Sequence, residues 1–207
     1  MKKLHWLPID IPKFEYCKEI VQDFKCEFIP PSAIAFAAQR LTVCDRLEDY
    51  HNYKESNWRT DLTDSQQKLK EYVDLYLPFS KLVTIKMHNI IKDSTWHFDF
   101  RAPDRNPELY SHNQQFEPCG YRIVIQGAQS GELQLSINDN ILLPSMPEDT
   151  DCYVLGHTST LHCNVGIPKD RYILFCHGWV DPIKHEELIA RSLKKYEQYA
   201  IWENKDE

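Results

Sequence analysis

The sequence contains no long hydrophobic run. No apolar stretch approaches the roughly 20 residues that a membrane-spanning helix needs. The opening segment, MKKLHWLPIDIP, carries a basic pair, but acidic and proline residues interrupt the apolar region that a signal peptide requires. These absences predict a cytoplasmic protein without a membrane partner.

Positive charge is also scarce. The formal net charge is −7, and the clustered lysines and arginines with which proteins contact a phosphate backbone are missing. A nucleic-acid partner is therefore not expected. The seven cysteines are odd in number and show no C-x-x-C or other metal-binding spacing, so we expect reduced, mostly buried thiols.

Repeats, low-complexity tracts and linkers are lacking as well, and 207 residues suit a single domain with a full core. The pattern within residues 1–80 is helical with loops. Apolar residues recur at helical spacing in 13–24, and Thr63 or Asp64 can cap a second helix. Residues 183–202 show a third, amphipathic helix. We expect these helices to support the region between them.

From residue 81 onward the sequence consists of short segments rich in β-branched and aromatic residues, separated by Gly, Pro, Asn, Asp and Ser. The segments are KLVTIKMHNII, WHFDF, YRIVIQG, GELQLSI, DCYVLGH and RYILFCHGW. The stretch GAQSGE, between the third and fourth segments, is typical of a hairpin turn. This pattern predicts a mainly β fold with flanking helices, either a sandwich or a jelly roll.

One strand-like segment carries a pair of polar residues, His97 and Asp99. Side chains at positions i and i+2 of a strand share a face, so the two would point the same way. With nine histidines in the chain, such a pair also arises by chance. Its side chains can simply hydrogen-bond each other at a solvated edge. The pair becomes informative only together with later residues.

A second polar segment, VLGHTSTLHCNVGIPKDRYILFCHGW, contributes His157, His162, His177 and Arg171. Arg171 opens an apolar strand and normally would sit at its wet end. If it points into a barrel, its guanidinium needs an anion, and the planar carboxylate of a small ligand suits its geometry. Two histidines and one carboxylate are the ligand set of non-haem Fe(II), which leaves coordination positions for a cosubstrate and O2.

In order and type, His-x-Asp, YRIVIQG, LHCN and DRYILF resemble the Fe(II)/2-oxoglutarate-dependent dioxygenases over residues 81–180. Within that family the sequence is similar to small hydroxylases related to aspartyl/asparaginyl β-hydroxylases and free-proline hydroxylases. The resemblance implies a double-stranded β-helix core, with Fe(II), 2-oxoglutarate and O2 as metal and cosubstrates. It also implies metal ligation by His97, Asp99 and His162, a 2-oxoglutarate anchor at Arg171, and cosubstrate or substrate contacts from Arg122 and Asn164.

Two positions depart from the family pattern, and one assignment has an alternative. Relatives often read R-x-H where this chain has Val124, and often carry Ser or Thr where it has Ile173. His157 could replace His162 as the second histidine ligand, although the spacing and the Cys-Asn that follow favour His162. His157 and His177 otherwise suit histidines that pack or hydrogen-bond near the site.

The resemblance implies an oxidoreductase that hydroxylates an amino acid, a peptide side chain or another small metabolite. Two other classes stay open: a cupin-like metal- or ligand-binding jelly roll without oxygenase activity, and a structural or interaction protein with dispersed histidines. The polar segment 101–118 is expected to rim the pocket, where Arg101, Arg105 and His112 could receive an acidic substrate.

Overall fold

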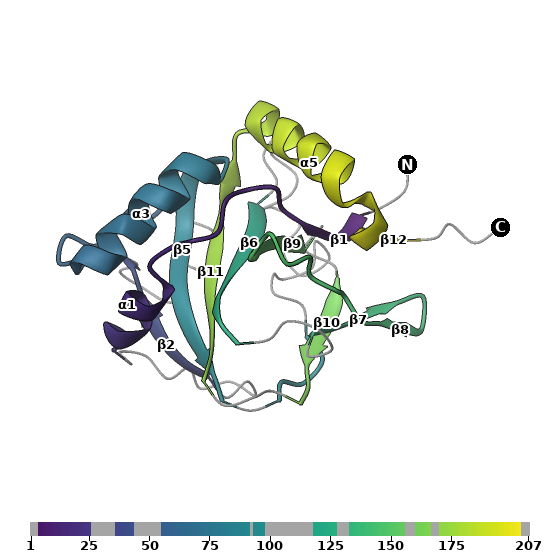
Figure 1. Cartoon of the computed structure of the whole chain (residues 1–207), viewed down its shortest axis with the longest axis horizontal. Helices are drawn as coiled ribbons and strands as arrows, with labels where there is room; N and C mark the ends of the chain where they lie inside the picture. Colours follow the sequence, from purple (N-terminus) through teal and green to yellow (C-terminus); the bar gives the residue numbers. More distant parts are fainter. Residues whose placement is uncertain are drawn as a thin grey trace.

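Two antiparallel β-sheets make the centre of the molecule (Figure 1). The computed structural model describes residues 4–25, 36–43, 55–91, 93–97, 118–127, 133–155, 160–166 and 170–203. The larger sheet has the order β12-β1-β9-β6-β11-β5-β2. Its strands are β1 (Leu4–Pro8), β2 (Phe36–Arg40), β5 (Phe79–Ile90), β6 (Pro118–Gln126), β9 (Cys152–Leu155), β11 (Arg171–Val180) and β12 (Ile201–Trp202). The smaller sheet, β10-β7-β8, contains β7 (Leu133–Ile137), β8 (Asn140–Leu142) and β10 (Leu161–Asn164), and β3 (Thr42–Val43) pairs with β4 (Asn57–Trp58).

From β5 onward the chain alternates between the two main sheets. Strands β5 and β6 lie in the larger sheet, β7 and β8 in the smaller one, β9 returns to the larger and β10 to the smaller. Strand β11 then enters the larger sheet between β5 and β6. Figure 1 shows β10 and β7 across from β5, β11 and β6. This antiparallel double-sheet topology is a jelly roll, so the predicted double-stranded β-helix core and mainly β fold with flanking helices are confirmed.

In the described ranges, the helices that lie outside the sheets are α1 (Cys17–Gln22), α3 (Asp64–Tyr76) and α5 (Pro182–Tyr196), the last followed by a 3-10 turn at Glu197–Tyr199. Thr63 begins α3 through a reciprocal capping box with Gln66, as the sequence predicts. The Asp181 side chain begins α5 by accepting from two backbone amides. Among the helices in the described ranges, none is long and apolar enough to cross a membrane.

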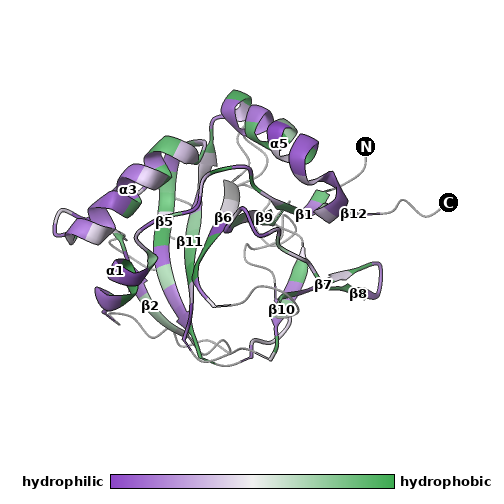
Figure 2. Ribbon diagram, in the orientation of Figure 1, coloured by the Kyte–Doolittle hydropathy of each residue, from purple (hydrophilic) through white to green (hydrophobic). Residues whose placement is uncertain are grey.

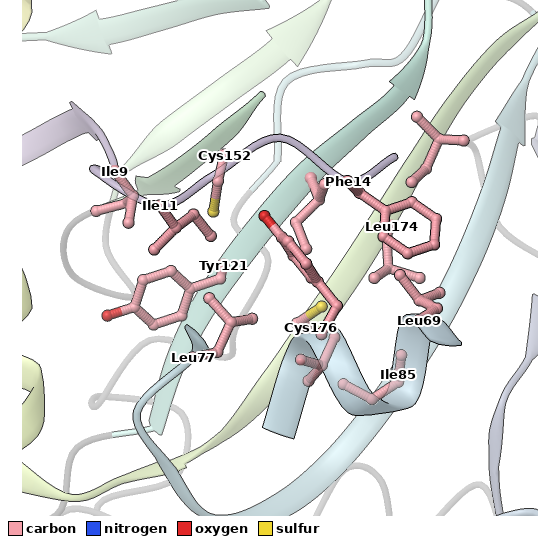
Figure 3. Close-up of a cluster of buried hydrophobic side chains, with 14 of the residues drawn as sticks. Ile9, Ile11, Phe14, Leu69, Leu77, Ile85, Tyr121, Cys152, Leu174 and Cys176 are labelled. Carbon is pink, nitrogen blue, oxygen red and sulfur yellow. The ribbon is translucent and has the colours of Figure 1, made fainter. Parts of the chain in front are cut away.

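Alternate residues of the long strands face opposite ways and thereby divide the core into two parts. On β11, Leu174 and Cys176 join an outer cluster with Leu69 of α3 and Ile85 of β5, as Figure 3 shows. Between the two sheets lies an inner cluster that includes Val124, Leu135 and Tyr153. Figure 2 shows hydrophobic residues along the strands and mostly hydrophilic ones on the helices. The larger sheet is therefore covered on both faces.

The prediction that residues 1–80 consist of helices and loops was wrong in part. This segment also supplies β1, which lies between β12 and β9, and β2, which pairs with β5 at the sheet edge. Four of the five β1 residues are buried, so β1 lacks the alternation of a half-exposed strand. The helix predicted for 183–202 ends at Tyr196, because the chain after the 3-10 turn becomes extended and pairs with β1 as β12.

The hairpin predicted at GAQSGE was also wrong, because β6 and β7 lie in different sheets. A hairpin forms instead between β7 and β8. Its turn residues, Asn138 and Asp139, have φ angles of 47° and 61°. Positive φ at both central residues is the requirement of a two-residue type I′ turn, and the short polar side chains of Asn and Asp tolerate it.

The packing of α3 on the larger sheet can be tested with two leucines of the same helix. Leu69 is fully buried in the outer cluster, whereas Leu75 is 72% exposed. We expect Leu69→Ala to lower the free energy of unfolding by about 2 to 5 kcal/mol, since it removes buried contacts and leaves a cavity. Leu75→Ala should change it by less than about 0.5 kcal/mol. Urea denaturation of both variants measures the difference, and equal losses would contradict the packing.

Candidate functional site

The structure brings His97 and His162 together. Residues 93–97 run antiparallel to β10, and the backbones of the two histidines exchange hydrogen bonds, with N···O distances of 2.9 and 3.0 Å. Ser94 and Asn164 form a second contact between the same two segments. The Ser94 amide donates to the Asn164 carbonyl at 2.9 Å, and the Asn164 amide donates to the Ser94 hydroxyl at 2.8 Å. The imidazole rings consequently lie 4.5 Å apart, centroid to centroid, with their planes at 51°.

Both imidazoles are oriented by a backbone carbonyl two residues earlier. Nδ1 of His97 lies 2.7 Å from the Thr95 oxygen, and Nδ1 of His162 lies 2.9 Å from the Thr160 oxygen. A carbonyl oxygen only accepts, so Nδ1 carries the proton in each ring and Nε2 is the nitrogen suited to bind a metal. The His97 ring is half-buried and the His162 ring is buried, and both can serve as neutral ligands.

Burial keeps these two histidines neutral. Desolvation is the main cause that lowers the pKa of His97 to about 4, followed by the charge of His162. Desolvation also lowers the pKa of His162 to about 3, with the nearby Arg122 charge as the next cause. Neutral imidazole is the form that coordinates metals. The pair therefore has the protonation state and tautomer of metal ligands.

Several predicted site residues lie outside the described residues. Asp99, the third predicted ligand, is among them, as are His157 and the loop that carries Arg101, Arg105 and His112. Within the described segments no group of three His, Cys, Asp or Glu residues gathers closely enough to hold a metal. The three-residue ligand set thus stays a prediction, of which the described residues contain the two histidines.

Arg171 lies inside the protein rather than at a wet strand end. Its side chain is fully buried, and Nη1 donates to Oδ1 of Asn164 at 2.9 Å. Asn164 and His162 are two residues apart on β10 and share its inner face. Gly127 lies against Arg171: a Cβ at that position would be 3.1 Å from the arginine Cγ, and its φ of 103° also favours glycine.

Arg122 lies in the same interior. It is buried on β6, and its guanidinium carbon is 4.3 Å from the ring centroid of Phe175 and 5.8 Å from that of Tyr153. The positive charge of Arg122 contributes to the lowered pKa of both His97 and His162. Arg122 is thus electrostatically part of the histidine site.

Two functional candidates were missed by the sequence reasoning, Lys86 and His88 of β5. Both are buried, and His88 stacks on Phe175 with ring centroids 4.9 Å apart at 14°. A signal was present in the sequence, because lysine and histidine alternate with the apolar Ile85 and Met87, as residues on opposite faces of one strand do. His177, suggested as a packing histidine, is fully buried with its ring 4.6 Å from Phe175.

The two departures from the family pattern are cross-strand neighbours. Val124 of β6 is paired directly with Ile173 of β11, and both are buried. Directly opposed residues share a face of the sheet, so Val124 and Ile173 place two apolar side chains next to each other on one face. On its other side, Ile173 is paired with His88. Val124 and Ile173 are therefore an apolar pair that lies beside the buried His88.

A cavity of about 290 Å³ lies elsewhere on the protein. It is lined by residues of β4, the end of α3 and the start of β5, among them Trp58, Asp74 and Lys81. None of the site residues contributes to it. The candidate site is therefore formed by the converging polar side chains and is separate from this cavity.

No protein-family model and no curated protein match the sequence. Solved structures that match this chain include an oxidoreductase of the 2OG-Fe(II) oxygenase family from Burkholderia pseudomallei, 13% identical, with a TM-score of 0.45 and coverage of 77% of this chain and 75% of that one. A prolyl-4-hydroxylase from Pseudomonas putida is 12% identical, with a TM-score of 0.41 and coverage of 87% and 90%. A full-length protein from Neurospora crassa, solved in complex with alpha-KG and 5-formyluracil, is 11% identical, with a TM-score of 0.40 and coverage of 84% and 73%.

A buried hydroxyl next to His162 offers a test of the metal site. Oγ1 of Thr160 lies 2.9 Å from Nδ1 of His5, and the carbonyl of the same threonine holds His162. We expect Thr160→Val to weaken Mn(II) or Co(II) binding by about tenfold, because loss of the bond to His5 frees the backbone segment whose carbonyl orients His162, and contacts that support a ligand in this way typically contribute about that much. Thr150→Val is the matched control, since Thr150 is equally buried but bonds the Ile9 carbonyl. Metal titrations measure both, and equal affinities in the two variants would contradict the site.

Replacing His177 by leucine should reduce the loss of stability in acid. Burial, followed by the charges of Arg122 and Lys86, holds the pKa of His177 well below its ordinary value. Below about pH 6.5 the unfolded chain therefore binds a proton that the native protein does not, and native stability falls as the pH drops. His177 contributes up to about 1.4 kcal/mol per pH unit to this fall, and H177L lacks the contribution. Urea unfolding of the metal-free proteins measures both profiles; parallel profiles would contradict a neutral buried histidine.

Proposed function

We propose that this protein is an Fe(II)- and 2-oxoglutarate-dependent dioxygenase that hydroxylates an amino acid, a peptide side chain or another small metabolite. The observation that carries the proposal is the His97–His162 pair, held by backbone hydrogen bonds with both Nδ1 atoms bonded to carbonyls. The buried Arg171 on the neighbouring part of the same jelly roll supports it. This combination suits a facial metal site with a nearby anchor for a dicarboxylate.

The residues present fit the metal. His97 and His162 would bind Fe(II) through Nε2, and Asp99 would supply the carboxylate oxygen that completes a two-histidine, one-carboxylate set. Bound iron and 2-oxoglutarate supply the activation of O2, with succinate and CO2 as the products from the cosubstrate. The protein keeps the two imidazoles neutral by burial, so that protons do not compete with the metal near neutral pH.

Arg171 would bind the distal carboxylate of 2-oxoglutarate. A guanidinium can donate two parallel hydrogen bonds to one carboxylate, and in a buried site this contact is both strong and directional. Asn164 fixes the guanidinium through its 2.9 Å hydrogen bond, and Gly127 leaves room for the side chain of Arg171. The protein would thus fix the orientation of the cosubstrate at the end remote from the metal.

Exchange of Arg171 for leucine separates cosubstrate binding from metal binding. Arg171→Leu should weaken 2-oxoglutarate binding by about 2 to 5 kcal/mol, the range for removing one partner of a buried charge pair, and leave Fe(II) binding nearly intact. His162→Ala should instead abolish both metal binding and turnover. Arg191→Leu is the control, because Arg191 is an exposed arginine that pairs with Asp10.

The measurement is an anaerobic titration of the Fe(II) protein with 2-oxoglutarate, followed by its visible metal-to-ligand charge-transfer band. Wild type and R191L should show the band at similar 2-oxoglutarate concentrations, whereas R171L should need far more. A protein that binds Fe(II) but never develops the band would refute the oxygenase proposal. The cupin-like metal-binding function would then be the better description.

A further inference from the structure

Phe175 is a partly exposed aromatic residue in the middle of a central strand. It lies on β11, whose backbone is paired with β5 on one side and with β6 on the other. Leu174 and Cys176, on either side of it along the strand, pack in the outer cluster, so the Phe175 side chain points between the two sheets. The exposed surface of Phe175 therefore belongs to its ring and faces the interior of the jelly roll.

The residues that surround Phe175 on this face are more deeply buried than Phe175 itself. Each of them is at most 8% exposed: Ile173, His177, Lys86 and Arg122. Water-sized molecules thus reach the phenylalanine ring but hardly reach the side chains next to it. Ligand sites are lined mainly by apolar and aromatic groups, and an accessible ring inside a barrel is apolar surface that a ligand can cover.

Contacts within the protein hold the Phe175 ring in one orientation. The His88 ring is stacked on it, with centroids 4.9 Å apart and planes at 14°. The guanidinium carbon of Arg122 lies 4.3 Å from the phenylalanine centroid, and the His177 ring lies 4.6 Å away at 54°. A ring that is already fixed loses little conformational freedom when a ligand covers it, and this favours binding.

The Phe175 ring lies near the two histidines and away from the proposed cosubstrate anchor. Arg122, which contacts the ring, is close enough to His97 and His162 for its charge to contribute to the lowered pKa of both. Arg171 lies four residues earlier on β11, which is about 13 Å between Cα atoms along a strand. The ring is therefore available to a ligand other than the one that Arg171 would bind.

We propose that Phe175 is a specificity-determining residue that contacts an apolar group of the substrate. The inference rests on the proposed function and specifies its substrate class: an amino acid or peptide residue with an apolar side chain, which carries the C–H bond that is hydroxylated. Covering the exposed ring with an apolar group removes two apolar surfaces from water. A polar side chain in the same place would lose hydrogen bonds to water without gaining any from the ring.

The test compares ligands that share a backbone and differ in their side chains. Fe(II) protein that already shows the 2-oxoglutarate charge-transfer band is titrated anaerobically with L-leucine, L-phenylalanine and L-proline, and with glycine and L-serine as references. The N-acetyl amides of the same amino acids represent peptide residues. We expect at least one apolar ligand to perturb the band at concentrations at least tenfold lower than both references, since apolar pockets discriminate by about 10- to 200-fold.

Variants of two phenylalanines assign the effect to this ring. Phe175→Ala should raise the concentration of the preferred ligand at least tenfold and change the 2-oxoglutarate requirement less than twofold, whereas Phe175→Leu should keep much of the affinity. Phe79→Ala is the matched control, because Phe79 is also partly buried but packs on Tyr121 in the outer cluster. If Phe175→Ala does not fold, Phe175→Val gives the same comparison.

Three outcomes would overturn this inference while the proposed function stands. In the first, the apolar ligands act at the same concentrations as glycine and serine, and in the second, none of them perturbs the 2-oxoglutarate-loaded protein. In the third, Phe175→Ala weakens 2-oxoglutarate binding as strongly as Arg171→Leu does, which would assign the ring to the cosubstrate. Absence of the band before any ligand is added would instead refute the proposed function, and this inference with it.

Discussion

Burial of both faces of the larger sheet is the constraint on which the rest of this structure depends. The helices cover one face and the smaller sheet covers the other, so each long strand must serve two environments with alternate residues. On β5, Ile85 and Met87 pack in the outer cluster, while Lys86 and His88 occupy the opposite face. The outer apolar layer supplies the burial that stabilises the fold, and the interior can consequently hold costly polar groups.

Backbone pairing, more than side-chain packing, positions the histidines. The segment 93–97 is held against β10 at two points, Ser94 with Asn164 and His97 with His162. Each imidazole is then fixed by a carbonyl of its own strand segment. Side chains held in this way on paired strands are rigid and their tautomer is set in advance, so the proposed metal binding would require little reorganisation.

The interior is layered along β11. Arg171 lies at one end beside Asn164, Ile173 forms an apolar step with Val124, and Phe175 separates two cations in the next row. Ile173 and Val124 lie between the positions of Arg171 and Arg122. The two arginines are therefore kept apart, although they belong to the neighbouring strands β11 and β6. Val124 and Ile173 thus place apolar side chains between Arg171 and Phe175 on the inner face.

Sequence alone determined the mainly β fold, the α3 helix with its cap, and the residue types of the site, because strand alternation, capping and ligand chemistry are local properties. It did not reveal β1, whose residues are buried on both faces, or the change of sheet between β6 and β7. Only the tertiary structure decided that His97 meets His162, that Arg171 is buried, and that Lys86 and Arg122 flank Phe175. These contacts join segments that are far apart in the sequence. The register in which the strands pair depends on how the two sheets pack, and no local sequence pattern fixes it.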